Sequence, residues 1–456
     1  MVSILILLSW AVVLMPRLVQ SLTAPKYRTT VDEPLPYTAL AALVERGVEL
    51  LLIAWCLLIV LRGLRSLPGD RRTALVFLMS PWIFMVCRDL YVDTKPKIAT
   101  LLWPVVIIAI WILRPRLERL ALLGWLVGFT AVLAIVMAFV LPEKGILSAL
   151  GGSLVEPDKQ ILSYGILIGP FTDGNNLGQF LSLGLPAILL IRRPGWRLVL
   201  AGVTVFAIVF SSSRSSIAAA LLSLVAVALL SAVPRITRVV LAGLIITAAA
   251  AAIVLIPVLN STDEGFTNRG FIWRVSLGVW MHDAPVIGNG SRYYTAIGDY
   301  ANPLGGNAFH GHNQFVQTVV TGGLIYLVLT AAMLAVLGVA AARWVRHGRL
   351  FPTVFLLAFF VSCTLEVSFG TVDRGFLFAV TTLPMAWIAF AATPQAASTT
   401  PSSRASALRS ASSSLDSSSF DMRLPSVTTT TPSTSLESAR ASAARNTGGA
   451  FTSTRS

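Results

Sequence analysis

Charged side chains are scarce in this sequence, and their scarcity argues against a soluble fold. Asp, Glu, Lys and Arg make up 12% of the 456 residues, whereas about a quarter of the residues in a typical soluble domain are charged. Hydrophobic residues make up 55%, and they gather in blocks long enough to cross about 30 Å of hydrocarbon. We therefore predict an all-α polytopic membrane protein with about twelve transmembrane helices.

Cysteine and clustered positive charge are also lacking. The three cysteines, Cys56, Cys87 and Cys363, lie within or at the edge of apolar blocks and show no metal-ligand spacing. The net charge of +14 comes from basic residues scattered through short loops and the C-terminal region. Because no basic face is interleaved with aromatic residues, nucleic acid is not an expected partner. The charge instead indicates membrane topology.

The apolar blocks and the arginines between them predict the arrangement of the chain. The expected spans are residues 2–16, 38–61, 72–87, 98–113, 120–141, 174–191, 196–211, 215–233, 239–258, 315–341, 350–367 and 375–392. The first block lacks a basic n-region and a cleavage site, so it is counted as a span and not as a signal peptide. Positive charge is retained in the cytoplasm. The Arg-rich loops expected there are 62–71, 114–119, 192–195, 234–238 and 342–349.

Two domains follow from this pattern. Residues 1–392 form the transmembrane helical domain, with a large extracytoplasmic loop at 259–314 and both termini in the cytoplasm. Residues 393–456 are rich in Ser, Thr, Ala and Arg and contain too few large apolar residues to bury a core, which predicts a disordered cytoplasmic tail. The tail is either a plain solvated segment or a site of phosphorylation or acidic-lipid binding.

Four polar segments on the predicted extracytoplasmic side are candidates for chemistry, because polar groups at a membrane surface or within it are costly without a purpose. The first, 169–176, leads into the sixth span. There Asp173 or Asn175 could cap the helix, or the helix N-terminus could bind an anion. The second is the serine turn 211–216 around Arg214. A guanidinium group suits a phosphate, and the alternative is an arginine that extends to lipid headgroups.

The third and fourth segments belong to the large loop and its end. Residues Phe271 to Met281 are expected to form an amphipathic helix on the membrane, which places Arg269 and Arg274 near the interface. Either arginine could simply bind lipid headgroups. His310 and His312 precede the tenth span. Histidine exchanges a proton near neutral pH. A zinc site is the alternative, but the sequence places no acidic or Cys partner beside the pair in a recognisable metal pattern.

The order of these motifs resembles that of the O-antigen ligase and O-antigen polymerase superfamily of bacterial envelope glycan enzymes, over roughly residues 35–392. His312-Asn313, nine further residues, Gly323, two residues and Tyr326 fit that family's pattern His-[Asn/Ser/Gln]-x9-Gly-x-x-[Gly/Thr/Tyr]. The accompanying features are the Ser-Arg-Ser turn at Arg214, the loop with Arg274 and Pro285-x-x-Gly288-x-Gly290, and about twelve spans.

The resemblance implies a GT-C-like, inverting membrane glycosyltransferase that needs no metal or cofactor and works at the outer face of the bacterial cytoplasmic membrane. Its donor would be a glycan on undecaprenyl diphosphate, and its acceptor would be a glycan or glycolipid. Membrane lipids would also contact the protein. His312 would be the catalytic base, with Arg214 and Arg274 on the diphosphate. The further substrate-binding candidates are Arg269, which matches less clearly, and Asn313, Asn175 and His310.

Other function classes remain open at this point. The C-terminal tail and the first external loop, Arg17 to Pro36, lie outside the shared pattern, which leaves the acceptor undefined. A transporter or lipid-linked-oligosaccharide flippase would carry ionisable residues at mid-membrane depth, and the spans hold few, namely Glu45, Arg46, Glu49 and Glu366. A membrane scaffold acting through its tail is the third possibility. Ligase and polymerase differ only in the acceptor that fits beside His312.

Overall fold

The helical character of the chain is clear in a computed structural model, which describes residues 1–24, 37–64, 71–92, 94–95, 97–147, 160–260, 262–294, 310–372 and 375–392. The α-helices are α1 (Val2–Thr23), α2 (Ala39–Gly63), α3 (Arg72–Tyr91), α4 (Leu102–Leu113), α5 (Ala121–Val140), α6 (Pro142–Gly145), α7 (Gly174–Ile188), α8 (Pro194–Phe210), α9 (Arg214–Ala232), α10 (Arg235–Leu259), α11 (Gly265–Asp283), α12 (Gln314–Arg346), α13 (Phe351–Leu365) and α14 (Phe378–Phe390). Short 3-10 helices η2 (Ile98–Leu101), η3 (Leu117–Leu120) and η6 (Gly375–Leu377) precede α4, α5 and α14. Strands β1 (Ile146–Leu147) and β2 (Ile166–Leu167) pair antiparallel.

Each of the twelve ranges expected to span the membrane coincides with a helix. Among the described residues, six helices are long and apolar enough to cross a membrane: α1, α3, α5 with η3, α9, α10 and α12. Four shorter apolar helices, α4 with η2, α8, α13 and α14 with η6, accompany them. The expectation of a polytopic helical membrane protein is therefore confirmed in this coarser form.

The burial of apolar side chains separates interior helices from helices that face lipid. The residues of α13 and α14 are buried along nearly their whole length. Helix α10 is as apolar, yet Val240, Leu244 and Leu259 on it are exposed. Large exposed apolar surfaces of this kind are rare on soluble monomers and are expected where a helix meets hydrocarbon.

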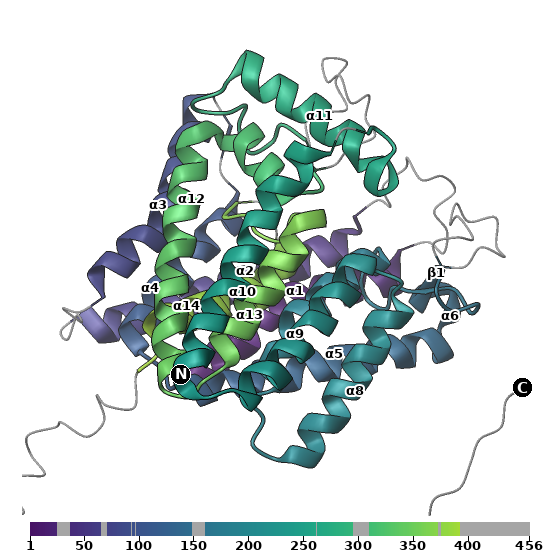
Figure 1. Cartoon of the computed structure of the whole chain (residues 1–456). Helices are drawn as coiled ribbons and strands as arrows, with labels where there is room; N and C mark the ends of the chain where they lie inside the picture. The colour runs from purple at the N-terminus through teal and green to yellow at the C-terminus, as the bar shows by residue number, and fades with distance from the viewer. Residues whose placement is uncertain are drawn as a thin grey trace, which may run out of the picture. The chain divides into compact units, whose positions relative to one another are not determined.

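Helix α12 lies at the centre of the arrangement that positions the candidate site. It packs against α3, α10, α11 and α13, and α13 in turn contacts α7, α9 and α10. Figure 1 shows α12 running along the bundle, with α11 lying across one end of it. The N-terminal part of α12 carries the His312-Asn313 motif at its start, so this packing determines where that motif lies.

A kink at Gly323 interrupts α12. Its φ of 65° and ψ of −164° belong to a region essentially restricted to glycine. The kink exposes backbone groups that would otherwise bond within the helix, and the loop after α11 pairs with them. The four bonds run from Asn289 N–H to Val320 O (2.7 Å), Gly290 N–H to Thr321 O (2.8 Å), Leu324 N–H to Pro285 O (2.9 Å) and Ile325 N–H to Val286 O (3.2 Å).

The end of α3 fixes the same loop from the other side. Arg88 Nη2 donates to Gly288 O at 2.6 Å, and its Nε donates to the same oxygen at 3.1 Å. The Asp89 carboxylate accepts from the Ser291 backbone N–H at 3.0 Å and from the Ser291 hydroxyl at 2.6 Å. The Pro285-x-x-Gly288-x-Gly290 motif is therefore a loop that connects α3 to the kink of α12.

Helix α11 is present where the large loop was expected to form a helix, but its apolar residues are spread around its axis and not gathered on one face. Trp273 is fully buried in a cluster with Tyr294, Val316 and Val319, which attaches α11 to α12. The Tyr294 hydroxyl donates to Ser276 Oγ at 3.0 Å, and burial raises the pKa of this phenol. The expected tail, 393–456, and residues 295–309 of the loop lie outside the described residues.

Candidate functional site

The turn before α12 presents His312 in a fixed orientation. His312 has a φ of 47°, a left-handed conformation that is uncommon for a residue with a side chain. The next residue, Asn313, caps α12 by accepting from Val316 N–H at 3.1 Å. Its amide nitrogen donates to Ile253 O and Thr364 O, each at 2.9 Å. Asn313 is fully buried and joins the start of α12 to α10 and α13, so its side chain positions the turn.

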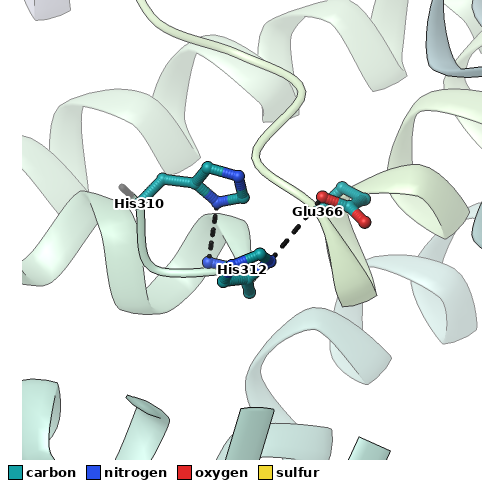
Figure 2. Close-up of side chains that lie close together, drawn as sticks. All are labelled: His310, His312 and Glu366. Atoms are coloured by element: carbon teal, nitrogen blue, oxygen red, sulfur yellow. Dashed lines mark hydrogen bonds and ion pairs between the residues drawn. The ribbon is translucent and has the colours of Figure 1, made fainter. Parts of the chain in front are cut away.

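A carboxylate that the sequence pattern did not associate with the histidines lies beside them. Glu366, directly after α13, places Oε2 3.9 Å from His312 Nδ1. Arg269 from α11 binds the other carboxylate oxygen, with Nη2 2.6 Å from Glu366 Oε1, and its Nη1 donates to the Leu365 carbonyl. Figure 2 shows Glu366 and the two histidines facing one another. Three separate segments of the chain thus contribute to one cluster.

The electrostatic balance of this cluster favours a charged Glu366. Glu366 is 4% exposed, and a buried charge of this kind is costly unless it is paired. The Arg269 guanidinium supplies the pairing charge, and its hydrogen bond to the carboxylate is of the strong, charge-assisted kind. The arrangement can therefore stabilise a positive charge on His312 and hold the imidazole ring in one orientation.

His310 packs directly on His312. The ring centroids are 3.9 Å apart with an interplanar angle of 43°, and His310 Nδ1 accepts from the His312 backbone N–H at 3.1 Å. Gly311, between them, donates its N–H to Gln317 Oε1 at 2.9 Å on the first turn of α12. His310 therefore supports the conformation of the turn together with Asn313.

The same three residues are chemically able to hold a metal ion. One ligand atom each from His310, His312 and Glu366 lies within 4.8 Å of the other two, and two imidazoles with a carboxylate are a usual ligand set for zinc. The acidic partner that the sequence did not show is supplied by the fold. A metal would compete with existing interactions, however, because Glu366 binds Arg269 and His310 Nδ1 accepts from the backbone.

Arg274 lies on the exposed surface of α11, away from this network of contacts. Its Nε donates to Asp263 Oδ1 at 2.8 Å, its Nη2 binds the second carboxylate oxygen, and the guanidinium lies 5.9 Å from the Phe271 ring. The Arg274 side chain is 64% exposed, and Asp263 is 49% exposed. An ion pair that is open to solvent holds its partners weakly.

The first two polar segments form a second cluster. Asp173 caps α7 by accepting from Asn175 N–H at 2.9 Å, as one of the two predicted capping residues. Helix α7 then approaches the serine turn so closely that a Cβ on Gly178 would lie 2.7 Å from Ser213 Cβ. Arg214, exposed, is the first residue of α9 and directly follows this turn. Asn175 and Arg214 thus lie at the starts of two packed helices.

A small cavity lies beside the first turns of α12 but is not the size of a substrate site. It measures about 30 Å³ and is lined by residues that include Gln317, Thr321 and Tyr326. A cavity of that volume has room for only about two or three water molecules. A sugar acceptor therefore does not fit in it as it stands.

Comparison with known proteins identifies the central part of the chain. Residues 198–331 match the O-Antigen ligase family. The matched segment runs from α8 into α12 and includes Arg214, Arg269, Arg274 and the His312-Asn313 motif, whereas Asn175 and Glu366 lie outside it. No curated protein matches the chain. The central part of the chain is therefore similar to the O-antigen ligase family, and this match supports an O-antigen ligase- or polymerase-like membrane glycan-handling enzyme.

Proposed function

We propose that the protein is a GT-C-like membrane glycosyltransferase that transfers or polymerises a glycan from an undecaprenyl-diphosphate donor onto an acceptor hydroxyl. The reaction takes place at the outer face of the bacterial cytoplasmic membrane, proceeds with inversion and needs no metal. The observation that carries the proposal is the His312–Glu366–Arg269 network at the start of α12, within a chain whose central part matches the O-antigen ligase family.

The proton transfer is assigned to His312. Because Nδ1 faces Glu366 at 3.9 Å, Nε2 is the nitrogen that accepts the proton of the acceptor hydroxyl. As the hydroxyl oxygen bonds to C1 of the donor sugar, the bond between C1 and the phosphate oxygen breaks, and the lipid diphosphate leaves with an additional negative charge. Glu366 stabilises the imidazolium that forms, much as a buried carboxylate does in other base catalysts.

The leaving diphosphate is assigned to two exposed arginines, Arg214 and Arg274. Arg274 exchanges a solvent-exposed ion pair with Asp263 for the diphosphate at modest cost. Preorganised guanidinium groups stabilise charge that develops in a transition state. Arg269 is instead committed to Glu366, so we assign it to positioning the base and only indirectly to the donor.

The positions of the helix ends support a shared location for Arg214, α11 and His312. Arg235 and Arg238, at the α9–α10 turn, line the same cavity as Arg346 and Arg349, at the α12–α13 turn. Helices α9, α10 and α12 contain 19, 25 and 33 residues, which corresponds to rises of roughly 28 to 50 Å. The opposite ends of these helices, which carry Arg214, α11 and His312, therefore face the other side of the membrane together. By the positive-inside rule that side is extracytoplasmic, and both termini are cytoplasmic.

The direct test uses purified full-length protein with a synthetic glycan on undecaprenyl diphosphate, without added metal. Transfer to a glycolipid acceptor indicates a ligase, whereas lengthening of the glycan on a second donor molecule indicates a polymerase. His312→Ala should abolish transfer while the protein remains folded in the membrane, and His282→Ala, which replaces an exposed histidine on α11, is the matched control. Full transfer by His312→Ala would remove the catalytic assignment, and a transporter or flippase would show no glycan transfer in any arm.

A further inference from the structure

A basic cavity lies at the end of the helices opposite to His312. Four arginines and a histidine line it, and they come from two turns that are more than 100 residues apart in the sequence. The cavity is open and measures about 570 Å³. Its lining residues are Arg235, Arg238, Arg346, His347, Gly348 and Arg349.

The positive charge of this cavity is poorly compensated by the protein. Arg349 pairs with Glu118 at 2.7 Å, but no carboxylate is among the described residues that line the cavity. Arg235 and Arg346 make no ion pair with any described residue. Arg238 donates from Nη2 to Val233 O at 3.0 Å, while its Nε is buried without a hydrogen-bond partner in the described part of the chain. Like charges that converge in this way repel each other, so an anion bound between them is stabilised.

The surroundings of the cavity indicate that this anion also carries apolar chains. Leu230, Ala242 and Val345 form a buried apolar cluster between the same helix ends. On the outer side of α10, Ile236 is 82% exposed and Val240 is 58% exposed. A free phosphate would use only the guanidinium groups, whereas a phospholipid would place its headgroup among them and its acyl chains along α10.

We propose that this cavity binds the headgroup of an anionic phospholipid from the cytoplasmic leaflet. Anionic lipids are concentrated in that leaflet, and basic pockets between transmembrane helices on the cytoplasmic side are suited to their headgroups. Arginine suits the phosphate because its planar donor fork can bind two oxygens at once. The bound lipid would hold the α9–α10 turn against the α12–α13 turn. It would thereby fix the C-terminal end of α12, whereas the His312 turn is at the N-terminal end of the same helix.

The test measures lipid binding by the purified full-length protein in a neutral detergent. Native mass spectrometry with phosphatidylglycerol, cardiolipin and phosphatidylcholine gives relative affinities. The double variant Arg235→Gln with Arg346→Gln should weaken binding of the anionic lipids by about 30-fold, which corresponds to about fivefold for each lost charge. The matched control, Arg192→Gln with Arg193→Gln, removes two exposed charges from another short loop and should change affinity less than twofold.

Additional variants and ligands distinguish a phospholipid from a free anion. Replacing Arg235 and Arg346 by Lys keeps the charge and should restore most of the binding, and thermal unfolding without lipid checks that each variant folds. Three outcomes overturn the proposal: equal binding of phosphatidylcholine, equal loss in both glutamine variants, or stabilisation by inorganic phosphate as large as that by anionic lipid. The last result would instead identify a site for a free phosphate.

Discussion

At the scale of single residues, the candidate base is held by neighbours on several sides. Asn313 fixes the backbone after it, His310 accepts from its backbone N–H, and Glu366 lies 3.9 Å from its Nδ1. The sequence predicted His312 because the spacing to Gly323 and Tyr326 is local and visible. Glu366 could not be associated with it, because the contact joins the start of α12 to the end of α13, and nothing in the spacing of the two residues indicates that they meet.

Replacing Glu366 tests whether the carboxylate positions His312. Glu366→Gln keeps the size of the side chain but removes the charge that stabilises the imidazolium. We expect kcat of Glu366→Gln to fall by about 10- to 100-fold with little change in KM. The loss is partial because the base itself remains, whereas His312→Ala removes the base and should abolish transfer. Glycan transfer by purified variants gives both constants, with the exposed Glu264→Gln as control. A Glu366→Gln enzyme with unchanged kcat would remove the proposed role.

Zinc provides a second test at this scale. If transfer needs no metal, EDTA should leave the rate of the purified enzyme unchanged. Added Zn²⁺ should inhibit reversibly, because two imidazoles and a carboxylate bind zinc and the metal would occupy the nitrogen lone pairs of the histidines. His310→Ala should weaken this inhibition, and His282→Ala, an exposed histidine on α11, should not. Loss of activity in EDTA would show instead that the reaction depends on the metal.

At the scale of elements, hydrophobic blocks were sufficient to predict the helices but not their distortions. The apolar runs at 98–113 and 375–392 indicated helices even though each begins with a 3-10 turn. The kink in α12 was not predicted, since a glycine within an apolar run is equally compatible with a straight helix. What distinguishes Gly323 is the loop that pairs with the exposed backbone around it, and that pairing is a long-range contact.

Gly323→Ala should destabilise this pairing. A Cβ at Gly323 would lie 2.3 Å from Val286 O, and the backbone conformation itself is strained for any other residue. We expect a loss of at least about 1 kcal/mol of stability and a loss of transfer activity, because α11 and the turn at His312 are connected to this loop. Gly338→Ala in the same helix is the control, since a Cβ there meets no atom within 4 Å. Thermal unfolding in detergent compares the two variants, and equal stability would contradict the role of the kink.

At the scale of the whole molecule, the alternation of Arg-rich loops predicts which helix ends share a side of the membrane. Two of the loops expected in the cytoplasm, 234–238 and 342–349, line one cavity. Local composition can predict the side of each loop because the membrane acts on each loop separately, and the side assigned to each loop stays a prediction. The relation between the Arg214 cluster and the His312 cluster depends on how helices pack, and it is the part of the site that composition does not predict.

Labelling of single cysteines tests the shared location of the two clusters. The background has its three cysteines, Cys56, Cys87 and Cys363, replaced by Ser. In this background, Arg214→Cys and Thr267→Cys introduce exposed thiols near the two clusters. Two further variants, Arg192→Cys and His347→Cys, introduce exposed thiols at the opposite helix ends. A membrane-impermeant maleimide applied to intact spheroplasts should label the first two and should label the second two only after permeabilisation. The expected result follows because α9, α10 and α12 each have one end at the basic cavity, so their other ends reach one face of the membrane. Labelling of position 214 from the opposite side to position 267 would separate the diphosphate arginine from the base by the thickness of the bilayer, and no donor could then contact both.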